Sequence, residues 1–161
     1  MISEHTCWTT KNTYERNEDM FKKTLYEQFL KFAKTKGFDD FEKTEDGTLT
    51  FFDQSKDSLY TITLVFGEET VDMCVKVNIA DEDMCEICKI MNELNVKHMN
   101  EKFYYENKEV CVYTRMRDEN VEEIAKYLIR LVMIAKTEFV RFRMMEIMKE
   151  KIGEDVEIVE V

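Results

Sequence analysis

The chain of 161 residues fits one domain of ordinary size, because compact domains cluster at roughly 100 to 150 residues. Hydrophobic residues make up 44% of it, which supplies enough apolar surface for a packed core and argues against wholesale disorder. The formal net charge of -11 would repel a phosphate backbone, so the composition argues against nucleic-acid binding that is independent of sequence.

The sequence also argues against membrane insertion and secretion. No apolar run approaches the roughly 20 residues of a membrane span, and the N-terminus lacks the hydrophobic block of a signal peptide. We therefore expect a cytoplasmic protein that does not bind membranes. The odd number of cysteines favours reduced thiols over a disulfide framework, and we expect most of them to be small core residues. They are Cys7, Cys74, Cys85, Cys88 and Cys111.

The start of the chain predicts a helix followed by strands. Residues 1–16 are polar and aperiodic, and we expect a flexible N-terminus there. Apolar residues at three- and four-residue steps predict a helix over about 18–36, which Gly37 can end in a left-handed cap. The pair Asp46-Gly47 predicts a tight turn between a weak strand near 38–44 and the strand that follows.

A change of period then predicts two longer strands. Apolar and polar residues alternate over 59–66 and again over 71–79, and Gly67-Glu68-Glu69 supplies a short turn between these runs. Short turns join antiparallel neighbours, so the sheet is predicted to be antiparallel.

The second half predicts a helix, a hairpin and a long helix. Asp81 is expected to cap a helix that ends near Lys97, and Asn107-Lys108 to form the turn of a second hairpin. Asp118 is expected to open a last helix whose apolar rhythm continues to about residue 150. Gly153 is expected to end it.

These elements predict one α+β domain over residues 17–152. The order is α-β-β-β-α-β-β-α with an extended C-terminal helix, and helices interleaved with hairpins favour an antiparallel sheet with helices packed on one face. The tail, residues 153–161, alternates like a strand and is expected to pair along a sheet edge.

The pair Cys85 and Cys88 is the sharpest chemical signal in the chain. Two thiols three residues apart on a helix can form a redox pair or half of a metal site. A zinc site needs four ligands, however, and no second ligand pair stands at a standard spacing. Core or partly buried cysteines are the simpler interpretation. We predict no catalytic residue, no metal and no cofactor.

The last helix is apolar on more than one side between residues 139 and 148, and such a segment usually packs between two neighbours. One neighbour is the domain's own sheet, and the other is a second subunit or a client chain. Methionine-rich surfaces adapt to varied partners. The residues expected on this partner or dimer surface are Met84, Met91, Leu94, Phe139, Phe142, Met145 and Met148.

Within residues 18–140 the chain resembles a known family. The resemblance rests on a helix ending in Leu94-Asn95, an aromatic strand at 102–105, a strand at 110–115 and a long closing helix. With this order of elements the chain resembles the YbjN-like proteins, which share the fold of class I type III secretion chaperones. The closing helix continues beyond the usual core of that fold, and the tail has no counterpart in it.

The resemblance implies a non-enzymatic, commonly acidic and dimeric module that binds a client segment or a regulatory partner, without a reaction. We therefore predict a chaperone-like or regulatory protein-binding module that forms a homodimer. The alternative is a thiol redox or metal-linked protein that uses Cys85 and Cys88. A third possibility is a ligand-sensing domain with a small apolar pocket beneath the sheet, for which the sequence offers no polar anchors.

Overall fold

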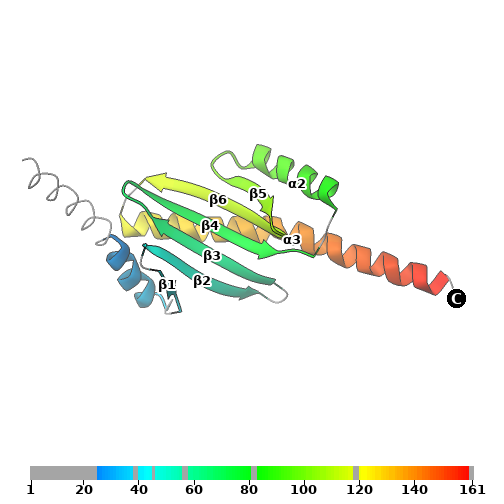
Figure 1. Ribbon diagram of the computed structural model, residues 1–161, viewed down its shortest axis with the longest axis horizontal. Coiled ribbons are helices and arrows are strands. Elements are labelled where there is room, and N and C mark those ends of the chain that lie inside the picture. Colours follow the sequence, from blue (N-terminus) through cyan, green and yellow to red (C-terminus); the bar gives the residue numbers. More distant parts are fainter. Residues whose placement is uncertain are drawn as a thin grey trace, which may run out of the picture.

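The computed structural model describes residues 25–37, 40–44, 46–55, 58–80, 83–117 and 120–159, with side chains as far as residue 153. Within these residues, six strands form one antiparallel sheet in the order β1-β2-β3-β4-β6-β5 (Figure 1). The strands are β1 (Glu42–Lys43), β2 (Thr48–Ser55), β3 (Ser58–Phe66), β4 (Thr70–Asn78), β5 (Lys102–Glu106) and β6 (Glu109–Arg117).

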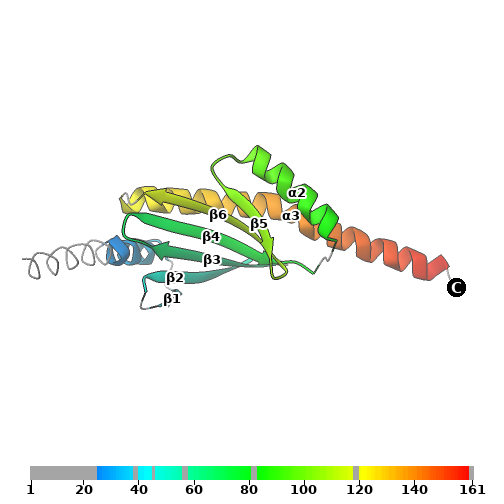
Figure 2. The same cartoon turned by 45° about the horizontal axis from the view of Figure 1, so that its top comes forward.

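Helices pack on one face of this sheet. A first helix occupies residues 25–35 of the described chain, and α3 (Val121–Val159) crosses behind the strands (Figure 1). The shorter α2 (Met84–Lys97) lies beside β5 at the sheet edge (Figure 2). This arrangement confirms the predicted α+β class, and the weak strand expected near 38–44 is present as the two-residue β1.

The core lies between the helices and the inward face of the sheet. Alternate residues of β3 and β4 point inward, so Leu64 and Met73 are fully buried, and from the helices Leu94 and Phe142 join them. Burying a large apolar side chain contributes about 1.5 to 3 kcal/mol, so this layer supplies most of the stabilisation of the fold. The first helix adds Phe29, whose ring centroid lies 5.7 Å from that of Phe66.

Three predicted turns are confirmed by their backbone angles. Gly37 ends the first helix with a φ of 86°, and Gly47 has a φ of 83° in the turn between β1 and β2. In the hairpin of β5 and β6, Asn107 and Lys108 have φ values of 53° and 61°. Positive φ at both central residues matches the right-handed twist of the flanking strands, which explains why this pair can form a two-residue turn.

The helix caps differ from the prediction. Asp83 caps α2, since its carboxylate accepts a hydrogen bond from the backbone N–H of Glu86 at 3.3 Å. Asn120 takes the same role for α3, where its side-chain oxygen accepts from the N–H of Glu123 at 3.0 Å. The expected caps, Asp81 and Asp118, lie outside the described residues. Several acidic and amide residues precede each helix, and the sequence alone cannot say which of them reaches the first turn.

The end of α3 also corrects the prediction. Gly153 does not stop the helix, which continues to Val159, so residues 153–159 are helical and do not form an edge strand. A glycine inside a helix costs only about 1 kcal/mol relative to alanine, which its helical neighbours can offset. The C-terminal part of α3 projects beyond the strands (Figures 1 and 2), so residues 153–159 have no sheet edge beside them.

Candidate functional site

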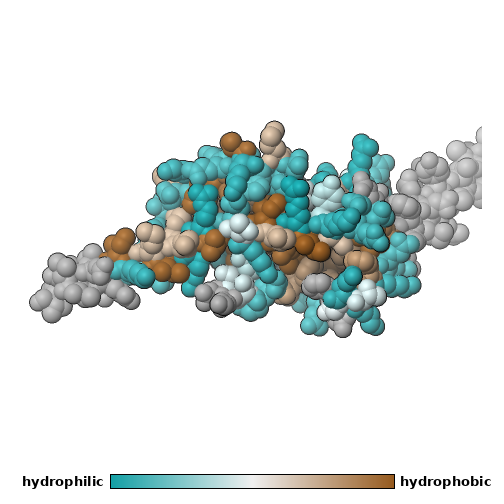
Figure 3. Space-filling model, turned by 180° about the vertical axis from the view of Figure 1, so that it is seen from behind, coloured by the Kyte–Doolittle hydropathy of each residue, from teal (hydrophilic) through white to brown (hydrophobic). Residues whose placement is uncertain are grey.

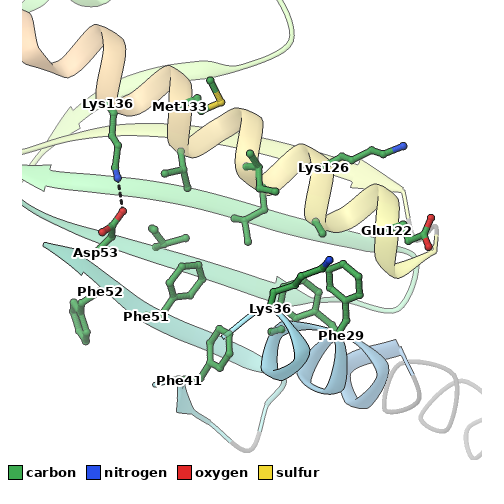
Figure 4. A pocket seen from close by; sticks show the side chains of 17 residues that line it. Phe29, Lys36, Phe41, Phe51, Phe52, Asp53, Glu122, Lys126, Met133 and Lys136 are labelled. Carbon is green, nitrogen blue, oxygen red and sulfur yellow. Dashed lines mark ion pairs between the residues drawn. The ribbon is translucent and has the colours of Figure 1, made fainter. Parts of the chain in front are cut away.

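An apolar groove of about 800 Å³ opens between the first helix, β2 and α3 (Figure 4). The first helix contributes Phe29, Phe32, Ala33 and Lys36, and the sheet side contributes Phe41, Phe51, Phe52, Asp53 and Ile62. From α3 come Glu122, Ala125, Lys126, Leu128, Ile129, Val132, Met133 and Lys136. A cavity of this size is large enough for several apolar side chains or a small ligand.

The helical period of α3 places apolar residues in the groove. Leu128 and Leu131 point into the core and are buried, while Ile129 and Met133 lie further round the helix. These two residues remain 61% and 63% exposed, although they line an apolar surface. Removing them from water would therefore be favourable, and the groove retains a driving force for binding an apolar partner.

Aromatic rings form the opposite wall of the groove. Phe41 and Phe51 meet edge to face, with ring centroids 5.2 Å apart and an interplanar angle of 79°. Both are only partly buried against the core, and Figure 4 shows them between β2 and the helices. Aromatic walls of this kind give a large contact area to an incoming apolar side chain.

Charged side chains stand at the rim of the groove. Lys136 and Asp53 form an ion pair at 2.5 Å that joins α3 to β2 across one end of it (Figure 4). The ammonium group of Lys136 also lies 5.9 Å from the ring centroid of Tyr60. Burial raises the pKa of the Tyr60 hydroxyl, and the positive charge of Lys136 offsets part of that rise. Lys36 and Lys126 add two further cations and Glu122 adds a carboxylate, while Lys126 also pairs with Glu123 at 3.4 Å, so the rim carries charges of both signs.

Exposed apolar residues continue along α3 from the groove to its projecting end. Figure 3 shows hydrophobic surface along the course of this helix. The exposed residues beyond Met133 are Val140, Met144, Ile147, Met148 and Ile152. The core ends near Met145, so Ile147, Met148 and Ile152 lie beyond it and remain exposed.

The structure divides the residues that the sequence assigned to a partner or dimer surface. Met91, Leu94, Phe139 and Phe142 are buried in the core of the single chain, and Met145 packs partly against that core. Met84 and Met148 are exposed. These two lie near the same corner, because their neighbours Asp83 and Lys149 approach within 3.7 Å.

The alternative site at Cys85 and Cys88 consists of two exposed thiols on α2. In the part of the chain that the structure describes, no group of three or more His, Cys, Asp or Glu side chains is close enough to hold a metal ion. Among the described helices, none combines the length and apolar character that crossing a membrane requires.

The sequence suggested an apolar pocket beneath the sheet only as a third possibility and did not locate this groove, because three separate elements form it. A signal was nonetheless present, since Ile129 and Met133 fall outside the inward-facing stripe of Ile124, Leu128 and Leu131. The expected two-sided apolar segment, residues 139–148, lies further along the same helix. Its inward side belongs to the core, and its outward side extends the exposed apolar surface that begins at the groove.

Comparison with solved structures finds this architecture in two complexes. A chain of the crystal structure of the ExsC-ExsE complex aligns with a TM-score of 0.57 at 14% identity, over 72% of this chain and 91% of that chain. A chain of the HopA1-SchA chaperone-effector complex aligns with a TM-score of 0.53 at 10% identity, over 73% and 92%. This protein has the type III secretion chaperone-like fold.

The other comparisons add no family to this likeness. No protein-family model matches the chain, and no curated protein matches it either. The narrower resemblance to YbjN-like proteins stays a prediction. Sequence identities of 14% and 10% establish a shared fold but not a shared function.

Proposed function

We propose that this protein is a non-enzymatic, chaperone-like module that binds a segment of a partner protein in the apolar groove. The observation that carries the proposal is an apolar groove of about 800 Å³ whose α3 wall keeps Ile129 and Met133 largely exposed. The similar chain of a chaperone-effector complex supports the proposal by fold alone.

The groove favours a segment with two or three bulky apolar side chains. Each such side chain gains about 1.5 to 3 kcal/mol on full burial, part of which offsets the cost of ordering the segment. The three lysines that line the groove exceed its two carboxylates, Asp53 and Glu122, by one charge, and this excess favours an acidic residue beside these anchors. The proposed partner is therefore an amphipathic segment with apolar anchors and acidic flanks.

Peptide binding tests the proposed site. The probe is a peptide selected by this protein from a displayed library of random 16-residue peptides. The enriched peptides are expected to share apolar anchors with neighbouring acidic residues. A selected peptide should then bind the Met133→Glu variant at least tenfold more weakly than the wild type, because burying an unpaired carboxylate in the groove is unfavourable.

Met99→Glu is the matched control, since Met99 is 91% exposed and does not line the groove. Its affinity for the peptide should stay within twofold of the wild-type value. Equal losses of affinity in the two variants would mean that the added negative charge, and not its place in the groove, weakens binding. Full affinity in Met133→Glu would overturn the proposed site.

We further propose that the chain forms a homodimer, for which Met84 and Met148 are the exposed residues of the predicted partner surface. Light scattering after gel filtration should give twice the 19.3 kDa of the chain. The double variant Met84→Glu/Met148→Glu should shift the mass to that of a monomer while leaving the far-ultraviolet circular dichroism unchanged. A wild-type chain that is monomeric at every concentration would end the dimer proposal and leave the groove proposal intact.

A further inference from the structure

Two cysteines meet on the face of the sheet that the helices leave open. Cys74 stands in β4 between the buried residues Met73 and Val75, so its side chain points to the opposite face. In β6, Cys111 has the same position between Val110 and Val112. The register pairs Cys74 with Tyr113 and Lys76 with Cys111, which makes the two cysteines diagonal neighbours on adjacent strands.

The contacts of the two thiols make them chemically different. The Cys111 thiol donates to the backbone carbonyl of Glu109 at 3.8 Å, and the sulfur of Cys74 lies 3.6 Å from the hydroxyl oxygen of Tyr104. The neighbouring Cys111 side chain lowers the pKa of Cys74 most, with further help from Tyr104 and the charge of Lys76, while burial and Glu109 oppose the change. The pKa of Cys111 is raised by the neighbouring Cys74 side chain and by burial.

The two thiols also differ in their exposure to solvent. Cys74 is partly exposed, whereas Cys111 is almost fully buried beneath the surface. The thiol that favours the thiolate form is therefore the one that a small oxidant can reach. The protonated thiol beside it is positioned to react second.

We propose that Cys74 and Cys111 are a peroxide-reactive thiol pair that closes to a reversible disulfide between β4 and β6. The Cys74 thiolate attacks one oxygen of a hydroperoxide, the O–O bond breaks, and Cys74 becomes a sulfenic acid while the other oxygen leaves as alcohol or water. The Cys111 sulfur then attacks the sulfenic sulfur, its proton passes to the departing hydroxide, and water leaves. In sum, two thiols and one hydroperoxide give one disulfide, one alcohol and one water.

Closing the disulfide requires a small movement of the two strands. Diagonal Cα atoms on neighbouring strands lie roughly 7 to 8 Å apart, whereas disulfides span about 4.4 to 6.8 Å. The strands therefore have to approach by about an ångström or rotate locally. A disulfide formed under such strain is reduced more readily than a structural one, which makes the modification reversible.

The test uses the full reduced chain and hydrogen peroxide as the probe. After a short exposure, free thiols are alkylated and the peptides are mapped by mass spectrometry. We expect the number of free thiols to fall by two from five, with a peptide that links Cys74 to Cys111 and is lost on treatment with dithiothreitol. Cys74→Ser should abolish this link, and Tyr104→Phe should slow its formation by about two- to tenfold, as expected for one lost hydrogen bond.

The double variant Cys85→Ser/Cys88→Ser is the matched control, because it removes the two exposed thiols of α2 and should form the link at the wild-type rate. A link between Cys85 and Cys88, with Cys74 and Cys111 still free, would overturn the proposal. So would a sulfenic acid that dimedone traps at Cys74 while Cys111 remains alkylatable. Both outcomes are read in the wild-type chain, so the test does not depend on whether a variant folds.

Discussion

The side-chain amide of Asn95 forms two hydrogen bonds with the backbone of Phe103. Its oxygen accepts from the Phe103 N–H at 2.8 Å, and its NH₂ group donates to the Phe103 carbonyl at 2.9 Å. The Asn95 side chain thus bonds to β5 in the way that the backbone of a neighbouring strand would, and it links the last turn of α2 to β5. This contact gives a physical role to the Leu94-Asn95 pair on which the family resemblance partly rested.

Replacing Asn95 with alanine should destabilise the chain, because the replacement leaves both backbone groups of Phe103 without their partner. We expect the free energy of unfolding in urea to fall by about 1 to 3 kcal/mol. Asn92→Ala is the control, since Asn92 is an exposed residue one turn earlier on the same helix, and its effect should stay within about 0.5 kcal/mol. Equal effects of the two changes would show that helix propensity outweighs the contact with Phe103.

Acid should weaken the link between α2 and α3 at Glu138. Burial by itself raises the pKa of this carboxyl, but hydrogen bonds from Lys97 at 2.6 Å and from His98 at 3.1 Å outweigh it, and the pKa is lowered below 4.5. Ionised Glu138 therefore stabilises the folded chain at neutral pH, and this contribution is lost as the pH falls through the lower folded-state pKa.

We expect Glu138→Gln to lower the free energy of unfolding by about 1 to 3 kcal/mol at pH 7. The difference from the wild type should shrink as the pH falls below 4.5, the ordinary pKa of the group. Urea unfolding at a series of pH values measures both quantities. Glu150→Gln, at an exposed position of α3, should leave the wild-type pH dependence unchanged. A difference that grows in acid would contradict the sign of the shift.

Alanine at two glycines should have opposite effects. At Gly153 a new Cβ meets nothing within 4 Å, so Gly153→Ala should favour the helix by about 0.5 to 1 kcal/mol. Amide exchange of residues 150–159 should slow accordingly. At Gly67 the same atom would lie 2.9 Å from the carbonyl oxygen of Thr70, so Gly67→Ala should lower the melting temperature. Unchanged exchange in Gly153→Ala would argue against a helix that continues through this position.

Alkylation of Cys74 should depend on pH near neutrality. The neighbouring Cys111 side chain lowers the pKa of Cys74 most, and Tyr104 and the charge of Lys76 add to this, so that the pKa falls to about 7 against the effect of burial. The rate of iodoacetamide labelling at Cys74 should therefore rise between about pH 6 and 8 and level off above. Cys111→Ala should move this rise to higher pH, because it removes the side chain that lowers the pKa of Cys74 most. A labelling rate that still climbs above pH 9 in the wild type would contradict a lowered pKa.

Local patterns in the sequence predicted the elements of this fold well. Alternation over 59–66 and 71–79 fixed which side of β3 and β4 is buried, and the turns at Gly37 and at Asn107-Lys108 follow from residues that tolerate positive φ. The extent of α3 was less predictable, since a single glycine such as Gly153 weakens a helix without ending it.

Features that depend on distant pairing could not be predicted. The outward direction of Cys74 and Cys111 is visible in the alternation, but their proximity requires β4 to pair with β6. The groove likewise needs the first helix, β2 and α3 to meet around Met133. Hydrophobic periodicity gives the direction of a side chain and not the identity of the neighbour that it meets.

The short strand β1 affects whether copies of this protein can associate through the edges of their sheets. A sheet edge with free N–H and C=O groups can recruit another chain and grow into an aggregate. β1 pairs only with Leu49 and Thr50 of β2, and it presents Glu42 and Lys43, two exposed residues of opposite charge. Where β1 lies, the sheet therefore ends in a strand that is too short and too charged to favour pairing with the edge of another copy.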